Sequence, residues 1–294
     1  MNFGGGVPLK SEEQVLKQIL EFASNDDRVR VVVLNGSRLN INAPKDIMQD
    51  YDVVFFINGV EDMSYKTDQS WIKQFGNLVI LQQNDFDDGS YIFLMQFKYG
   101  LRIDLCFKAI EKLNILAGED SLSKILLDKD NIADKIPEPN DSIYFMKKPG
   151  EKEWDSAINN LWWIQTYVAK GIWRDELPYV KYMYDVIFMD GIRKLLSWNI
   201  GLEYDWQVNV GKCGKWFKCL LKKDLYDEFI SIYSGTDYDD IWQKLFKAGE
   251  LIRKVGMELS EILGYIYPME YDINVSEFIR KIKVLPNEAQ SFDD

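Results

Sequence analysis

Histidine is absent from this sequence of 294 residues. Its absence excludes catalytic schemes that need an imidazole base, such as a Ser-His-Asp triad, and metal sites with histidine ligands. Cysteine is scarce, and Cys106, Cys213 and Cys219 show no paired spacing that would indicate a disulfide framework or a zinc site. Acid–base or metal chemistry in this protein must therefore rest on carboxylates, lysines or tyrosines.

A long apolar run is also lacking. No stretch approaches the roughly 18–20 apolar residues that a membrane-spanning helix needs, and residues 1–10 do not resemble a signal peptide. We therefore expect a cytoplasmic protein that has no membrane partner. The run Gly4-Gly5-Gly6 predicts that residues 1–10 form a flexible tail.

Basic residues are outnumbered, with 35 Lys and Arg against 47 Asp and Glu, so the net charge is −12. Such a surface repels polyanions and attracts cations, and a nucleic-acid partner is therefore not expected. Hydrophobic residues make up 47% of the chain and aromatic residues 14%, which is typical of a globular protein with a substantial core.

The hydrophobic pattern of the first half predicts an α/β region. Residues 11–24 have apolar positions at helical spacing, and Ser11 and Gln14 form a capping box at their start. In residues 101–108 apolar and polar side chains alternate, as in a strand with one buried face. Further strands are predicted over residues 29–34, 52–57, 78–82 and 91–98.

The second half has helical periods. Residues 157–172 and 245–263 each carry an apolar stripe, and in the latter Gly249 and Gly256 predict close helix packing. Residues 137–150 contain three prolines and predict a linker. The predicted fold class is therefore α+β, with a mixed β-sheet domain and flanking helices over residues 11–140 and a C-terminal helical bundle over residues 141–294.

Two aspartates stand at the start of a predicted strand. Asp50 and Asp52 are two residues apart, so their carboxylates point to the same face. The like charges repel unless a cation lies between them, and Mg²⁺ suits such oxygen ligands. Asp104 supplies a third carboxylate from the polar face of the strand at 101–108, and three carboxylates around Mg²⁺ are typical of phosphoryl transfer. An isolated Asp-x-Asp is, however, more often a charge pair at a strand edge.

A Gly-Ser turn precedes these aspartates. Gly36 and Ser37 end the strand at 29–34, and twelve residues separate Ser37 from Asp50. Such a turn, if it leads into a helix, offers backbone N–H groups and a hydroxyl to phosphate oxygens, and Arg38 can add a guanidinium. The combination is more specific than either motif alone, and it predicts a site for a nucleotide and a metal ion.

With these motifs the sequence resembles the DNA polymerase β-like nucleotidyltransferase superfamily. Within that superfamily it is most similar to the aminoglycoside 6-adenylyltransferases, which are streptomycin-resistance enzymes. The resemblance covers nearly the whole chain after residue 10. It is carried by Leu34–Phe56 (LNGSRLNINAPKDIMQDYDVVFF), Arg102–Leu105 (RIDL), Ile125–Asp130 (ILLDKD), Lys170–Tyr179 (KGIWRDELPY) and Ile241–Phe246 (IWQKLF).

The resemblance implies roles for the residues of the first domain. Gly36 and Ser37 are expected to hold the β- and γ-phosphates of ATP, and Asp50 and Asp52 to bind Mg²⁺. Asp104 is expected to complete the site as a metal ligand or as the base. The implied reaction is attack of a streptomycin hydroxyl on the α-phosphorus of ATP with release of pyrophosphate.

The helical domain is expected to bind the substrate. Lys215, which ends the basic turn Gly211-Lys212-Cys213-Gly214-Lys215, is a candidate for the triphosphate, and the alternative is a solvated surface lysine. Trp173, Asp175 and Glu176 form an aromatic and acidic patch that suits a polycationic sugar. The alternative for this patch is a solvated helix end. The segment 128–129 is a weaker candidate for a position near the nucleotide.

Other functions remain open at this stage. The acceptor can be another small molecule, such as a lincosamide or a different aminocyclitol, or a protein hydroxyl. An inactive relative that still binds nucleotides or cations is a further alternative, and a role in RNA tailing is disfavoured by the net charge of −12. The expected partners are ATP and an aminoglycoside, and the expected state is a monomer or a weak dimer.

Overall fold

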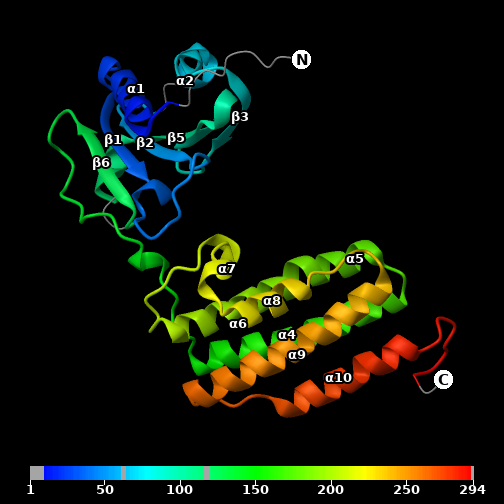
Figure 1. The fold of residues 1–294 in the computed structure, drawn as a ribbon. Helices are drawn as coiled ribbons and strands as arrows, with labels where there is room; N and C mark the ends of the chain where they lie inside the picture. The colour runs from blue at the N-terminus through cyan, green and yellow to red at the C-terminus, as the bar shows by residue number, and fades with distance from the viewer. Residues whose placement is uncertain (1–9, 61–63, 116–119, 293–294) are drawn as a thin grey trace, which may run out of the picture. The chain divides into compact units, whose positions relative to one another are not determined.

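Two units of different architecture make up the chain in the computed structural model: a sheet unit of residues 1–143 and a helical unit of residues 144–294 (Figure 1). The structure describes residues 10–60, 64–115 and 120–292. The predicted flexible tail lies outside this part of the chain except for Lys10. The ammonium of Lys10 donates a hydrogen bond to the carbonyl of Phe75 at 3.0 Å.

A six-stranded mixed sheet forms the centre of the sheet unit. Strands β2 and β5 are parallel, and every other neighbouring pair is antiparallel. Across the sheet the order is β3 (Leu78–Asp85), β4 (Tyr91–Phe97), β5 (Arg102–Ala109), β2 (Tyr51–Ile57), β1 (Val29–Asn35) and β6 (Ser123–Asp128).

The five predicted strands are confirmed, whereas the edge strand β6 was not predicted. Its apolar residues Ile125, Leu126 and Leu127 are consecutive and only half-buried, so the sequence shows no alternation there. The pattern is weak because an edge strand has a neighbour on one side only.

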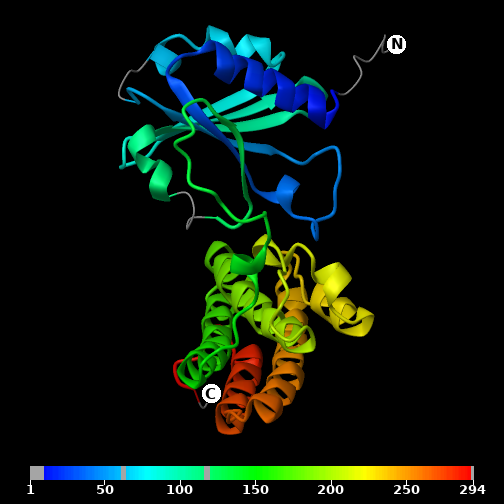
Figure 2. The same cartoon turned by 90° about the vertical axis from the view of Figure 1, so that its left-hand side faces the viewer.

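Helix α1 (Glu12–Asn25) covers one face of the sheet (Figure 2). It begins with the predicted capping box of Ser11 and Gln14. Its buried residues join a large apolar cluster that includes Phe55 of β2 and Phe107 of β5. The alternation predicted for β5 is therefore confirmed, since Phe107 belongs to this core. Residues of the other parity, such as Asp104, face the opposite side of the sheet.

The helical unit confirms the predicted bundle. Residues 145–150 lead into it, and the predicted linker contains only a short 3₁₀ turn, η5 (Ser142–Tyr144). A π-helical segment over residues 182–188 joins two of its helices. The elements are α4 (Glu151–Trp173), α5 (Leu177–Lys181), η6 (Tyr182–Phe188), α6 (Met189–Glu203), α7 (Phe217–Leu220), α8 (Lys223–Ser231), α9 (Tyr238–Leu263) and α10 (Met269–Val284).

Close packing around the glycines of α9 is also confirmed. A Cβ atom on Gly256 would lie 2.8 Å from the ring of Tyr267, and one on Gly249 would lie 3.5 Å from the side chain of Gln165 in α4. Among the helices that the structure describes, none is long and apolar enough to cross a membrane.

Candidate active site

The parallel pairing of β2 and β5 brings two of the predicted aspartates together. In the register of these strands Asp52 lies directly beside Asp104. Both residues are on the face of the sheet that α1 does not cover, because their parity is opposite to that of the core residues Phe55 and Phe107. Asp50 directly precedes β2 and extends the same row of carboxylates.

A guanidinium lies between the carboxylates of this site. Arg102 donates from Nε to Asp104 Oδ1 at 2.9 Å and from Nη2 to Asp104 Oδ2 at 2.8 Å. Its Nη1 atom is 3.4 Å from Oδ2 of Asp50. No role was predicted for Arg102 from the sequence. The signal was its spacing of two residues from Asp104, which puts both side chains on one face of β5.

The charge on Asp52 is not balanced in the same way. Burial, followed by the negative charges of Asp104 and Asp50, raises the pKa of Asp52 from 3.8 to about 6, although Arg102 opposes this shift. Ionised Asp52 therefore lies in an environment with surplus negative charge. Such an environment favours either a proton or a bound cation.

Gly36 links the Gly-Ser turn to the aspartates. Its φ angle is +83°, and a Cβ atom here would lie 2.3 Å from Oδ2 of Asp52. The carboxylate of Asp52 thus occupies the space that a side chain at position 36 would need. Asn35, which pairs with Asp52 across β1 and β2, accepts a hydrogen bond from the hydroxyl of Ser123 at 2.9 Å. Asn35 is a further neighbour of the site that the motifs did not indicate.

The backbone after Gly36 differs from the prediction. The expected helix is only a 3₁₀ turn, η1 (Ser37–Leu39). The amide of Gly36 donates to the carbonyl of Leu122 at 2.9 Å, so this N–H group is not available to a phosphate. The hydroxyl of Ser37 has no hydrogen-bond partner within the described ranges and remains available.

Arg38 holds the segment that leads into β2. Its guanidinium stacks 3.6 Å from the centre of the Tyr51 ring. It donates to the carbonyls of Asp50 at 3.0 Å and Gln49 at 2.7 Å, and it pairs with Glu12 at 3.1 Å. Arg38 was predicted to bind the nucleotide, whereas in the structure these contacts engage its guanidinium in positioning Asp50. The sequence missed this role because it depends on residues that are distant along the chain.

The carboxylates of this site suit Mg²⁺, but three of them do not stand together as metal ligands. In the part of the chain that the structure covers, no three His, Cys, Asp or Glu residues are grouped so that they could hold a metal ion. Both oxygens of Asp104 accept hydrogen bonds from Arg102. Asp50 and Asp52 nevertheless provide hard oxygen donors, and the space beside Gly36 accommodates the Asp52 carboxylate. These two residues would hold the ion.

The candidates from the helical unit do not form one group. Lys215 is exposed, and its ammonium lies 5.3 Å from the centre of the Trp216 ring. The indole of Trp173 donates to the carbonyl of Pro286 at 3.2 Å, and Asp175 accepts from the hydroxyl of Tyr238 at 2.8 Å. Both side chains thus have structural partners at the end of α4.

The two remaining candidate segments also have structural contacts. Glu176 precedes α5, and its amide donates to the carbonyl of Gly171 at 2.9 Å. In the sheet unit Asp128 accepts from the amide of Ala133 at 2.9 Å, while the ammonium of Lys129 donates to the carbonyl of Ala23 at 2.9 Å at the end of α1. These contacts stabilise turns and a helix end.

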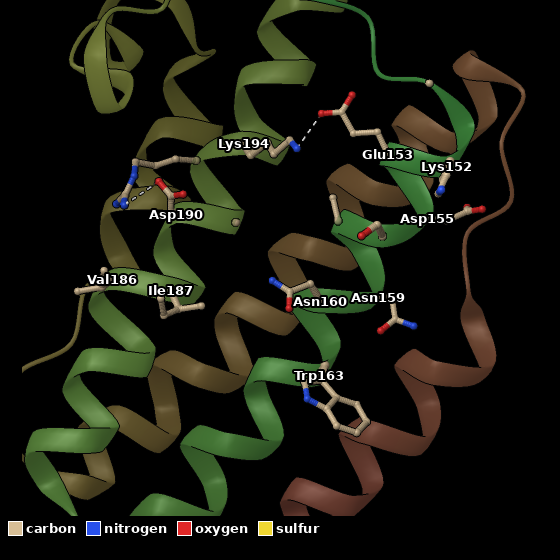
Figure 3. A pocket seen from close by; sticks show the side chains of 15 residues that line it. Lys152, Glu153, Asp155, Asn159, Asn160, Trp163, Val186, Ile187, Asp190 and Lys194 are labelled. Carbon is tan, nitrogen blue, oxygen red and sulfur yellow. Dashed lines mark hydrogen bonds and ion pairs between the residues drawn. The ribbon is translucent and has the colours of Figure 1, made fainter. Parts of the chain in front are cut away.

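A large polar groove lies on the helical unit between α4 and the segment formed by η6 and α6 (Figure 3). Its volume is about 1370 Å³. Lys194 and Glu153 point toward each other across it, 2.8 Å apart. Trp163 lines the groove with 55% of its surface exposed. None of the predicted site residues lines the groove, although a tryptophan within the polar stripe of α4 was a visible signal.

The sheet, the Gly-Ser turn and the row of aspartates together define a nucleotidyltransferase. The chain belongs to the streptomycin adenylyltransferase family, whose model matches residues 9–282. It is 33% identical to the aminoglycoside 6-adenylyltransferase of Bacillus subtilis (strain 168), over 93% of this chain and 98% of that protein. It is also 33% identical to the enzyme of the same name from Campylobacter jejuni, over 94% and 96% of the two chains.

A solved structure was also matched, that of an aminoglycoside 6-adenyltransferase from Bacillus subtilis. The identity to this structure is 28%, the TM-score is 0.48, and the match covers 94% of this chain and 100% of that chain.

The raised pKa of Asp52 gives a prediction on stability. Between pH 3.8 and about 6 the folded protein holds a proton that the unfolded chain releases, so the free energy of unfolding falls as the pH rises. At pH 8 the ionised carboxylate costs the metal-free protein roughly 3 kcal/mol. We expect Asp52→Asn to be more stable than the parent protein at pH 8 in the presence of a chelator, by about 1–3 kcal/mol in urea denaturation. The difference should vanish near pH 4.

Asp26, also in the sheet unit, has a lowered pKa, in contrast to Asp52. Its hydrogen bond with Arg28, together with a weaker one from Tyr65, lowers the pKa of Asp26 to about 2. The stabilisation from this ionised carboxylate is present above pH 3.8 and is lost as the pH falls toward 2. Asp26→Asn should therefore be less stable at pH 8. If Asp52→Asn also loses stability at pH 8, the electrostatic description of the site is wrong.

The contact between Gly36 and Asp52 gives a second prediction. Gly36→Ala and Gly89→Ala both place a side chain at a φ angle near +80°, but a Cβ atom at Gly89 meets nothing within 4 Å. We expect Gly36→Ala to lower the free energy of unfolding by about 1–3 kcal/mol more than Gly89→Ala, because it overlaps the Asp52 carboxylate. In an Asp52→Ala background the extra loss should disappear. Its persistence there would mean that another contact is responsible.

Proposed function

We propose that this protein transfers AMP from ATP to a hydroxyl of streptomycin. The proposal is carried by the row of carboxylates, in which Asp52 lies beside Asp104 in the register of β2 and β5. Membership of the streptomycin adenylyltransferase family supports the class of acceptor. Curated relatives named aminoglycoside 6-adenylyltransferase, similar over more than nine-tenths of this chain, support it as well.

The reaction has a simple balance of bonds. The oxygen of the acceptor hydroxyl forms a bond to the α-phosphorus of ATP, and the bond between that phosphorus and the bridging oxygen of pyrophosphate breaks. The hydroxyl proton passes to a carboxylate of the site. Asp50 and Asp52 would hold Mg²⁺, whose positive charge would offset the charge of the phosphates. The protein itself orients the reactants and excludes competing water.

The triphosphate requires hydrogen-bond donors and positive charge. The hydroxyl of Ser37 lies in the turn beside Asp52, and it can donate to a phosphate oxygen. Lys215 is exposed on the helical unit and is free of carboxylate partners among the described residues. Its ammonium suits a phosphate as a point charge. We assign Ser37 to the triphosphate, and we assign Gly36 to making space for Asp52.

The groove of the helical unit suits the acceptor. On the polar side of α4, Asp155, Asn159 and Trp163 follow one another at intervals of four residues and so share one face. The indole can cover an apolar face of a sugar ring, and the amide can bond its hydroxyls. The carboxylate of Asp155 can pair with a guanidinium. The two guanidinium groups of streptomycin match an acidic protein whose net charge is −12.

The activity is tested with labelled ATP, Mg²⁺ and a panel of acceptors that contains streptomycin, other aminocyclitols and a lincosamide. We expect adenylylated streptomycin and one equivalent of pyrophosphate. Asp52→Asn should lower kcat at least 100-fold, since a lost charge at a phosphoryl-transfer site costs about 3 kcal/mol or more. Asp87→Asn, in the exposed turn between β3 and β4, is the matched control and should keep full activity. Transfer to another acceptor, or none with saturating Mg²⁺, contradicts the proposal.

The acceptor groove is tested through Trp163. We expect Trp163→Ala to raise KM for streptomycin by about 5- to 30-fold, in line with the 1–2 kcal/mol of a partly desolvated aromatic contact. KM for ATP should not change, and Trp163→Phe should retain most of the affinity. Trp173→Ala is the informative comparison, because Trp173 lines a different pocket, of about 270 Å³. If Trp173→Ala raises KM for streptomycin and Trp163→Ala does not, the acceptor does not bind in the groove.

A further inference from the structure

We propose that Arg102 is the resident cation of the carboxylate site, which neutralises Asp50 and Asp104 in the metal-free protein and competes with the metal ion for them. This inference deepens the proposed function and rests on its metal requirement. It assigns Arg102 a charge-balancing and positioning role rather than contact with the reacting atoms.

The geometry places Arg102 where a metal ion would meet the same oxygens. Its guanidinium holds both oxygens of Asp104, at 2.9 and 2.8 Å, and reaches Oδ2 of Asp50 at 3.4 Å. A carboxylate that accepts two hydrogen bonds from a guanidinium in this bidentate arrangement has its best lone pairs occupied. Asp104 can ligate a cation fully only after Arg102 withdraws.

Withdrawal is feasible because the two partners differ in burial. The side chain of Asp104 is 11% exposed, whereas that of Arg102 is 38% exposed. Arg102 is the first residue of β5, and it reaches the site along the solvent side of the sheet. Its long side chain can therefore move into water without disturbing the strand, while Asp104 stays fixed beside Asp52.

The charges of the site require such an exchange. Three aspartates and one arginine leave a charge of −2, and the surplus is felt at Asp52, whose neighbours Asp104 and Asp50 are both acidic. A bound divalent cation supplies the missing charge, and the positive charge of Arg102 then opposes it at close range. A unit charge about 5 Å away is worth roughly 1–3 kcal/mol at the effective dielectric constants of a protein surface.

Metal binding by variants of the full-length protein tests this competition. Mn²⁺ binding is measured by calorimetry without nucleotide, at pH 7.5 and fixed ionic strength. We expect Arg102→Gln to bind Mn²⁺ about tenfold more tightly than the parent protein, because the opposing charge is gone. In the presence of a chelator the same variant should be less stable, since Asp50 and Asp104 lose their counter-ion. Arg102→Lys keeps the charge and should stay within about threefold of the parent affinity.

Arg30 offers a matched control. Arg30 lies in β1 and makes a bidentate ion pair with Asp130, which follows β6, and Arg30→Gln changes the net charge by the same amount. Its Mn²⁺ affinity should equal that of the parent protein. If Arg102→Gln binds Mn²⁺ no more tightly than Arg30→Gln, or more weakly, Arg102 does not compete with the metal and the inference is overturned.

A measurement on the unmodified protein covers the case in which Arg102→Gln fails to fold. Arginine side chains are labelled with phenylglyoxal, and the labelling of Arg102 is followed by peptide mass spectrometry. We expect Mg²⁺ to increase the labelling of Arg102 several-fold over that in chelator, while labelling of Arg30 stays constant. Unchanged or reduced labelling of Arg102 overturns the inference. If the labelling of Arg102 does not increase but the protein transfers AMP with Mg²⁺, the inference on Arg102 fails and the proposed function stands. If the protein neither binds the metal ion nor transfers AMP, the inference and the proposed function both fail.

Discussion

The mutual repulsion of three carboxylates on adjacent strands is the constraint around which the sheet unit is organised. Parallel pairing of β2 and β5 fixes Asp52 beside Asp104, and the aromatic residues on the other face of these strands bury the sheet against α1. Burial therefore holds together charges that would separate in water. The cost appears at Asp52 as a raised pKa, and it is offset in part by Arg102. Surplus negative charge of this kind favours either a proton or a bound cation.

Several contacts keep this row of carboxylates in place. Arg38 donates hydrogen bonds to the carbonyls of Gln49 and Asp50 and also pairs with Glu12 of α1. These contacts connect the helix to the segment that leads into β2. On the other edge the hydroxyl of Ser123 in β6 holds Asn35 next to Asp52. Asp52 and Asp104 thus stand on strands rather than on loops, which limits their motion and suits a reaction that depends on orientation.

The helical unit combines a rigid core with a polar groove. Inside it, Asp272 is fully buried and accepts hydrogen bonds from Arg253 at 2.6 Å and from Tyr267 at 2.8 Å, which ties α10 to α9. The groove forms on another side, where Gly191 of α6 leaves space for Leu161 of α4. The π-helical segment η6 forms part of its wall, and such segments are frequent at functional sites because they interrupt regular helix packing.

The sequence by itself determined the fold class, the strands with clear alternation and the three aspartates, because periodicity and residue chemistry are local properties. The absence of histidine already restricted the acid–base and metal chemistry to carboxylates, lysines or tyrosines. Only the tertiary structure decided which groups meet. It joined Gly36 to Asp52, Arg102 to Asp104, and Arg38 to the segment before β2, and it separated Trp173 from the groove that Trp163 lines. These outcomes depend on strand register and long-range packing, which single-sequence patterns do not encode.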